Sequence, residues 1–425
     1  MSSHSKGSRS CIETQRLQRA PGSLTVIAVS SQSHALSGDF AASAPIAAVQ
    51  ADGIPWYCYA VAFGAACIPI GTLWDISWHL SIGRDSFWTP AHMMIYLGGA
   101  LPGSVCGGLV LKNTFWPGPG ESSATVRIWG FRGPLGAWLV IWGAFTMLLS
   151  GPFDNWWHNA YGLDVQIISP PHTVLALGTY ATAIGALLLV LSWQNRAPPE
   201  NHFAANLLVL FACGVLLTML SVFVTEYSYP NSQHGAAFYE VCCRALPLYF
   251  IVAARVSKIK WSATWVSLIY MAIRMAMVWI LPLFSSEPKL APIYNPITHM
   301  APPPFPLLLV APAFGIDLVM QAAGRKRGFW RDTGLALLLA AVFFFLLLAV
   351  QWPFSDFLLS KGARNAFFAG NAMWGYPDRL GQWCTQFWEP ENRLGLKSSV
   401  VAILLGALMA RIALWFGNWL SEVKR

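Results

Sequence analysis

Long apolar segments separated by short polar ones make up almost the whole chain. Each apolar segment is roughly 20 residues long, which is the length a helix needs to cross the hydrocarbon layer of a bilayer. The alternation of single apolar and polar positions that is typical of strands is not evident. The pattern therefore predicts an all-α fold, a polytopic transmembrane helical bundle of about ten spans. We expect the spans at 54–74, 90–111, 134–151, 170–193, 204–225, 236–255, 262–284, 304–322, 333–352 and 398–420.

The polar stretches divide the chain into four parts. Residues 1–50 are rich in Ser and Ala, which predicts a disordered tail, although their short apolar stretch also faintly resembles a targeting segment. Residues 51–352 form the transmembrane core. Residues 353–397 are rich in aromatic side chains and are expected to form an outer loop along the membrane interface. Residues 398–425 form the last span and a cytoplasmic end.

Composition supports a membrane protein, with the lipid bilayer as its surroundings. Only 11% of the residues are charged, against about 25% in soluble proteins. The 21 Trp and 12 Tyr residues suit the aromatic belts at the two membrane interfaces. The net charge of +8 does not indicate nucleic acid, because the basic residues form no patch interleaved with aromatic side chains. Nucleic acid is therefore excluded as a partner.

The basic residues gather in alternate loops, and this predicts the orientation. Positively charged loops remain on the cytoplasmic side of a membrane. We therefore expect a multi-pass protein of the cell's inner (plasma) membrane with both termini in the cytoplasm, and with loops 75–89 and 152–169 on the outer face. The basic residues concerned are Lys112, Arg127, Arg132, Arg196, Arg255, Lys258, Lys260, Arg325, Lys326, Arg327 and Arg331.

One polar pattern occurs twice, at 71–99 and at 150–179. The first copy contains WDISWHLSIGRDSFWTPAH and the second FDNWWHNAYGLDVQIISPPH. Both have D-x-x-W-H, then a Gly, an Asp and a Pro-containing approach to a second His. Each copy lies between two apolar segments, so we expect an internal repeat of a helix pair. The candidate metal ligands are Asp75, His79 and His92 in the first copy, and Asp154, His158 and His172 in the second.

The spacing brings the members of each triplet together. Asp75 and His79 are four residues apart and share one face of a helix, as do Asp154 and His158. Each second His follows Ser or Thr and Pro, a signal for the start of the next helix. Two imidazoles and one carboxylate suit copper, zinc or iron. Asp85 and Asp164 are expected as further ligands or as groups that orient a ligating His. Capping of helix ends without a metal is the other interpretation.

The first triplet also resembles a known signature. Asp75, His79 and His92 have the D-x3-H-x12-H spacing that resembles the metal-binding motif in the C subunit of the particulate methane and ammonia monooxygenase family. The second triplet matches it with one more residue before the last His. The resemblance implies a helical membrane fold, copper on the outer half of the bilayer, and oxidation of methane, ammonia or short hydrocarbons. It covers about twenty residues per copy, and the duplication and the number of spans depart from that subunit.

Several other polar residues are candidates for accessory roles. His234 and His299 each lie near an outer helix start and are candidates to join or line a site, and a hydrogen-bonded loop histidine is the other interpretation of each. Glu240 and Arg244 are four residues apart in one span, which predicts an internal ion pair. An ion pair between Arg274 and Asp317, in neighbouring spans, is expected as structural support, with a proton route or an anion site as the alternative. The eight Cys residues include no C-x-x-C pair, so a disulfide framework or a thiolate cluster is not expected.

Three functions remain open from the sequence. The first is a membrane metalloprotein that binds copper, with zinc and iron as the alternative metals, and that has monooxygenase-like activity in its enzymatic form. The second is a transporter or metal-handling channel in which Arg274, Glu240 and Asp317 lie along one polar path. The third is a b-haem protein with the four repeat His residues as axial ligands, or a non-catalytic partner subunit. Other membrane subunits or a homo-oligomer are the expected partners. Motifs for nucleotide binding, zinc proteases, serine hydrolases and haem c are absent.

Overall fold

The computed structural model describes residues 53–83, 86–118, 124–162, 169–198, 201–229, 232–287, 289, 298–358 and 392–424. All of them belong to one compact unit, Ala44–Arg425. This part of the chain is all-α, as predicted, apart from one short β-hairpin that the sequence did not indicate. Its elements are α1 (Trp56–Ser81), α2 (Pro90–Phe115), β1 (Val126–Ile128), β2 (Phe131–Gly133), α3 (Leu135–Tyr161), α4 (Pro170–Gln194), α5 (His202–Val224), α6 (Ala236–Ala245), α7 (Pro247–Val256), α8 (Ser262–Ile280), α9 (Val310–Ala323), α10 (Phe329–Leu358) and α11 (Leu396–Leu420).

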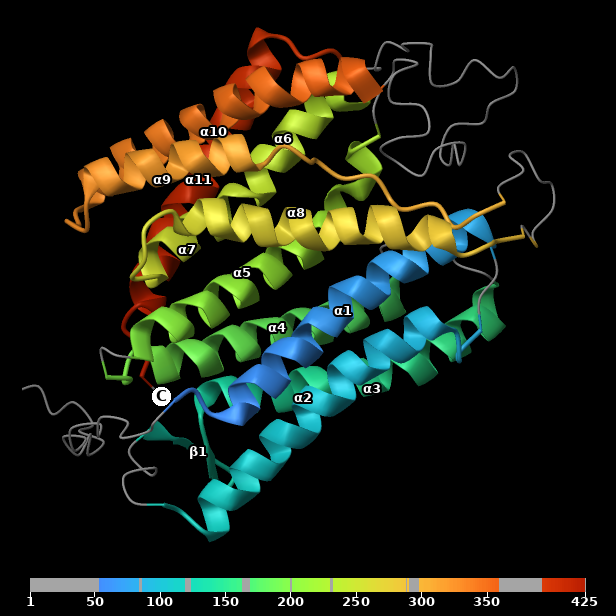
Figure 1. Ribbon diagram of the computed structural model, residues 1–425, viewed down its shortest axis with the longest axis vertical. Helices are drawn as coiled ribbons and strands as arrows, with labels where there is room; N and C mark the ends of the chain where they lie inside the picture. Colours follow the sequence, from blue (N-terminus) through green and yellow to red (C-terminus); the bar gives the residue numbers. More distant parts are fainter. Residues whose placement is uncertain are drawn as a thin grey trace, which may run out of the picture. The chain divides into compact units, whose positions relative to one another are not determined.

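Within these residues, nine helical segments are long and apolar enough to cross a membrane. The protein is therefore a multi-pass membrane protein. Nine of the ten predicted spans coincide with these segments, and α6 and α7 together form one of them with Pro247 at the break. Helix α5 contacts α1, α4, α7 and α8, which places it at the centre of the packing. Figure 1 shows these helices side by side.

The span predicted at 304–322 is only partly helical. Helix α9 begins at Val310, and the preceding residues form the extended connection that leads into α9 in Figure 1. This connection contains four Pro residues between 302 and 306, which have no N–H to leave unsatisfied in an apolar interior. Its carbonyls are bound by side chains of α8: Arg274 donates to Pro303 and Pro304 at 3.0 and 2.8 Å, and the Tyr270 hydroxyl donates to Pro306 at 3.0 Å.

The first four helices form two hairpins that repeat each other, which confirms the predicted internal repeat. In the first hairpin, Gly98 of α2 lies directly against Gly64 and Ile68 of α1. In the second, Gly178 of α4 lies in the same way against Gly143 and Met147 of α3. These residues correspond pair by pair when the second hairpin is shifted along the sequence to match the first. A glycine at each of these positions lets the two helix backbones approach closely.

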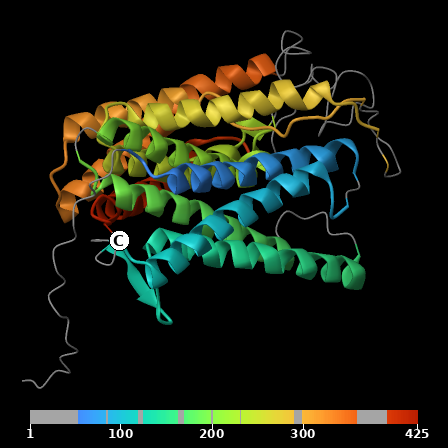
Figure 2. The same ribbon diagram turned by 60° about the horizontal axis from the view of Figure 1, so that its bottom comes forward.

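The ends of α1 and α3 and the starts of α2 and α4 lie at the same end of the bundle, and the C-terminus lies at the other, as Figures 1 and 2 both show. Helices α1 and α3 extend to Ser81 and Tyr161, well beyond the predicted boundaries at 74 and 151. The first residues of the predicted loops 75–89 and 152–169 are therefore helical. The predicted tail 1–50, and residues 359–391 of the predicted outer loop, lie outside the described residues.

Candidate metal centre

The last turns of α1 and the first turn of α2 position the first triplet. Asp75 and His79 lie on one face of α1, one turn apart. The chain turns after α1 at Gly83, which has φ of +85°, a conformation that favours glycine. The hydroxyl of Thr89 then accepts a hydrogen bond from the backbone N–H of His92, and Pro90 is the first residue of α2. His92 is thereby held at the start of α2, facing the end of α1.

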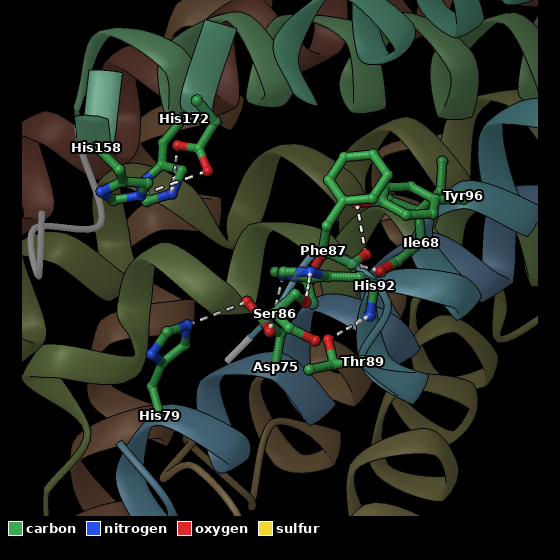
Figure 3. Close-up of polar contacts among 12 residues, drawn as sticks. Ile68, Asp75, His79, Ser86, Phe87, Thr89, His92, Tyr96, His158 and His172 are labelled. Carbon is green, nitrogen blue, oxygen red and sulfur yellow. Dashed lines mark hydrogen bonds and ion pairs between the residues drawn. The ribbon is translucent and has the colours of Figure 1, made fainter. Parts of the chain in front are cut away.

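The two imidazoles of this triplet approach different oxygens of one carboxylate. The Nε2 atom of His92 lies 3.2 Å from Oδ1 of Asp75, and the Nε2 atom of His79 lies 3.8 Å from Oδ2. Figure 3 shows both rings directed at Asp75. The side chains of Asp75 and His92 are each 21% exposed, whereas His79 is half exposed. The triplet is thus partly buried and open on the His79 side.

The second hairpin repeats this arrangement with its own residues. The Nε2 atom of His158 lies 3.4 Å from Oδ2 of Asp154, and the Nε2 atom of His172 lies 3.7 Å from Oδ1. Ser169 accepts a hydrogen bond from the backbone N–H of His172, as Thr89 does in the first hairpin. Gly162 follows α3 with φ of +90°. The convergence predicted for both triplets is what the structure has.

Hydrogen bonds to backbone carbonyls orient His92 in the first hairpin and His158 in the second. The Nδ1 atom of His92 is 3.0 Å from the carbonyl of Ser86, and the Nδ1 atom of His158 is 3.2 Å from the carbonyl of Gly162. A carbonyl only accepts, so each Nδ1 carries the proton that it donates. Neither Ser86 nor Gly162 was a predicted site residue. The sequence did contain one hint of Gly162, because a Gly follows the first His by four residues in both copies.

This orientation has an electrostatic consequence. With its proton on Nδ1, a neutral imidazole presents the lone pair of Nε2 to the carboxylate. Two acceptors in contact repel, so a cation is required between them: either a second proton on the ring or a metal ion. The Oδ1 atoms of Asp75 and Asp154 are both buried and accept no aligned hydrogen bond from the described residues. A buried, uncompensated carboxylate oxygen is costly, which adds to the demand for a cation.

In their present positions, the side chains do not close around a single point. Among the described residues, no group of three or more His, Cys, Asp or Glu side chains is arranged to hold a metal ion. The distances between donor atoms are nevertheless close to those of a metal site. Donors about 2.0–2.2 Å from a tetrahedral metal are about 3.4 Å apart, and the four distances between imidazole and carboxylate in the two hairpins are 3.2 to 3.8 Å.

The predicted accessory residues do not join the triplets where the structure describes them. Asp85 and Asp164 lie outside the described residues. His234 is 2% exposed and pairs with Asp356 at 2.9 Å, with its Nδ1 atom 3.3 Å from the Ser355 hydroxyl. Burial lowers the pKa of His234, and Asp356 opposes part of that shift. His299 is exposed and contacts the hydroxyl of the neighbouring residue Thr298 at 3.0 Å.

The expected intramembrane ion pairs are both wrong. Asp317 accepts hydrogen bonds from the backbone N–H groups of Ala263 and Thr264 and from the Thr264 hydroxyl, at 2.8 to 3.1 Å, so it caps the start of α8. Arg274 instead binds the carbonyls of the extended connection and stacks on Phe305, with its guanidinium carbon 4.3 Å from the ring centre.

Glu240 and Arg244 form no ion pair with each other within the part of the chain that the structure describes. Glu240 is half-buried and Arg244 is exposed. The helical spacing that suggested the pair is present, but the two side chains do not meet.

Aromatic rings next to the first triplet connect the two hairpins. The Phe87 ring lies 5.1 Å from that of Tyr96, centre to centre, and the Tyr96 hydroxyl donates to the Phe87 carbonyl at 3.1 Å. A Cβ on Gly151 of α3 would lie 3.4 Å from the Phe87 ring, so the turn of the first hairpin packs one helical turn before Asp154.

Comparison with protein-family models, with curated proteins and with solved structures finds no match to this chain.

Proposed function

We propose that this membrane protein binds a transition-metal ion at each of two equivalent sites, with Asp75, His79 and His92 as ligands of one and Asp154, His158 and His172 as ligands of the other. The observation that carries the proposal is the repeated geometry, in which two imidazole Nε2 atoms approach the two oxygens of one carboxylate. Helix capping alone needs neither this geometry nor its duplication.

The arrangement supplies what a metal site requires beyond its ligands. Hydrogen bonds from Nδ1 to backbone carbonyls leave Nε2 of His92 and His158 free of a proton in the neutral ring, which is the form that binds a metal. Rotation of the half-exposed His79 ring would close the first triplet around an ion, and rotation of the His172 ring, which is 35% exposed, would close the second. The cation also compensates the buried oxygens of Asp75 and Asp154.

Copper is the metal that we propose first, with zinc and iron as the alternatives. Two imidazoles and a carboxylate suit all three, and the spacing in the first triplet resembles the copper-binding motif of the particulate monooxygenases. A metal held by three protein ligands keeps open positions, through which copper or iron supplies oxidising chemistry toward a small substrate. On the predicted topology, both sites face away from the cytoplasm. A monooxygenase-like oxidising subunit is therefore the enzymatic form of the proposal.

The test is the metal content of the purified full-length protein after loading with Cu(II) and removal of excess metal. We expect about two ions per chain, about one in each of the Asp75→Ala and Asp154→Ala variants, and none in the double variant. The same series gives nitrogen couplings in the electron paramagnetic resonance spectrum that disappear with the ions. His299→Ala is the matched control, because His299 lies outside both triplets and should leave two ions bound. Equal copper in the double variant and the control would rule the proposal out.

A transporter is the second candidate, and the broken crossing before α9 is the observation that favours it. Transporters often bind substrate where a helix is interrupted. Here, however, Arg274 and Asp317 are both engaged in binding backbone groups, and residues 301–307 are buried. Uptake of copper or zinc into vesicles that contain the purified protein would support this candidate. A b-haem group is less compatible, because Asp75 lies between His79 and His92, where a porphyrin would have to fit.

A further inference from the structure

The polar face of helix α6 points away from the protein interior, where a single copy of the protein in a membrane would meet lipid. Its buried residues include Phe238, Tyr239, Cys242 and Cys243, which face the protein interior. The opposite face holds Ala237, Glu240 and Arg244, of which Ala237 and Arg244 are exposed and Glu240 is half-buried. Residues spaced by three and four positions lie in one row along a helix, so these three form a continuous surface.

This surface lies within a segment that is long and apolar enough to cross the membrane. Helices α6 and α7 form one candidate span, Ala236–Val256. Arg244 is eight residues from its start, which is about 12 Å along the helix axis. A charged side chain at that depth, facing lipid, is expensive, and such residues normally have a partner.

Three other charged residues in the described spans contact groups within the chain. Arg274 binds two carbonyls, Asp317 caps α8, and the guanidinium of Arg411 lies over the Phe329 ring at 5.6 Å. Glu240 and Arg244 make no hydrogen bond or ion pair within the described residues and none with each other. Their partners must therefore come from outside the described part of this chain.

We propose that this surface is the contact between two copies of the protein, in which Glu240 of each copy pairs with Arg244 of the other. The argument for a second copy is charge complementarity: the surface carries one acid and one base, so it complements itself. In a two-fold dimer within a membrane, the two α6 helices run parallel, and the contact is the same on both sides. Glu240 and Arg244 are separated by about 6 Å along the axis, a distance that the long Arg side chain spans. The exposed Ala237 allows the helix backbones to approach.

The proposal is tested on the full-length protein, labelled with donor and acceptor dyes and reconstituted in liposomes of phosphatidylethanolamine and phosphatidylglycerol. Energy transfer measured at increasing lipid dilution gives the dimer dissociation constant. The single charge reversals Glu240→Arg and Arg244→Glu place like charges together, and we expect each to weaken the dimer by about 30-fold or more. The double variant E240R/R244E restores opposite charges across the contact and should recover most of the affinity.

The double variant also separates a loss of contact from a loss of folding, because it has the same composition as the natural protein. A protein that is monomeric at every lipid ratio would overturn the proposal. So would a dimer that is unaffected by the single reversals, since its contact would lie elsewhere, or a double variant as weak as the single ones. Cross-linking of an Ala237→Cys variant to its own copy, with none for a Cys at the exposed position Leu268 on α8, provides a second readout. None of these outcomes depends on metal binding.

Discussion

Replacing Gly178 by Ala tests the packing that brings the second triplet together. A Cβ at this position would lie 2.8 Å from the backbone N of Met147 and 2.9 Å from the carbonyl oxygen of Gly143. Ordinary contacts begin at 3.4 Å, and neither atom belongs to a side chain that can rotate away. Helices α3 and α4 must therefore separate by roughly 0.5 Å or more, and overpacking of this kind costs about 1–3 kcal/mol.

The matched control is Gly108→Ala in α2. Gly108 is exposed, and nothing lies within 4 Å of the Cβ that the substitution adds. Ala is intrinsically better than Gly in a helix by about 0.5–1 kcal/mol, so this variant should be neutral or slightly more stable. The signs of the two changes in the free energy of unfolding are therefore opposite, although the chemical substitution is the same.

The assay is unfolding in mixed micelles of increasing sodium dodecyl sulfate content, followed by tryptophan fluorescence. We expect the two variants to differ by about 2 kcal/mol. The Gly178→Ala variant should also lose copper affinity at the second site, because Asp154 and His172 lie on the two helices that separate. Equal stability of the two variants would contradict the reasoning, since it would mean that the close approach of α3 and α4 is not needed.

Three further predictions concern buried polar groups. Because burial lowers the pKa of His234, the unfolded chain binds the proton more readily than the folded one between that lowered value and about 6.5, and stability should fall as the pH drops through this range. A His234→Asn variant should therefore show a flatter pH profile of the free energy of unfolding. A profile that the substitution leaves unchanged would contradict the lowered pKa. Arg274→Leu leaves two buried carbonyls without a donor and should destabilise the protein by about 1–3 kcal/mol per unsatisfied group in the same micelle assay, while a neutral effect would show that the extended connection does not need it. Asp317→Ala removes the cap of α8 and should cost about 0.5–2 kcal/mol, with faster amide exchange at Ala263 and Thr264 as its local sign; unchanged exchange there would argue against capping.

The triplets could be predicted from the sequence because every step in the argument is short-range. Asp75 and His79 are related by one helical turn, and Thr89 with Pro90 marks the start of the next helix. An antiparallel pair then brings a helix end beside the next helix start, with no need to know how the rest of the bundle packs. The same steps hold in the second hairpin, and the structure has the close approaches in both.

The prediction that Arg274 pairs with Asp317 failed because two residues in different helices meet only if they lie at the same level along the membrane normal, which no short-range pattern gives. In a continuous helix from 304, the helical rise of about 1.5 Å per residue would set the position of Asp317 along the membrane normal. The Pro residues keep the chain extended up to Val310, so α9 is a short helix and Asp317 lies level with the start of α8. Arg274 is about 18 Å further along α8. The run of Pro residues was visible in the sequence, but the apolar composition of the segment outweighed it.

The duplication of the triplets also helps to distinguish cation binding from helix capping as the reason for their geometry. A backbone carbonyl fixes the Nδ1 proton on His92 in the first hairpin and on His158 in the second. Helix capping accounts for Thr89 and Ser169, which bind the backbone N–H groups of His92 and His172, but it does not require the imidazoles to face a carboxylate. What the copies share instead is the final arrangement, in which Nε2 atoms face the oxygens of one carboxylate and a cation is needed between them. Because the same arrangement occurs in both hairpins, it supports the proposal of cation binding more strongly than a single copy would.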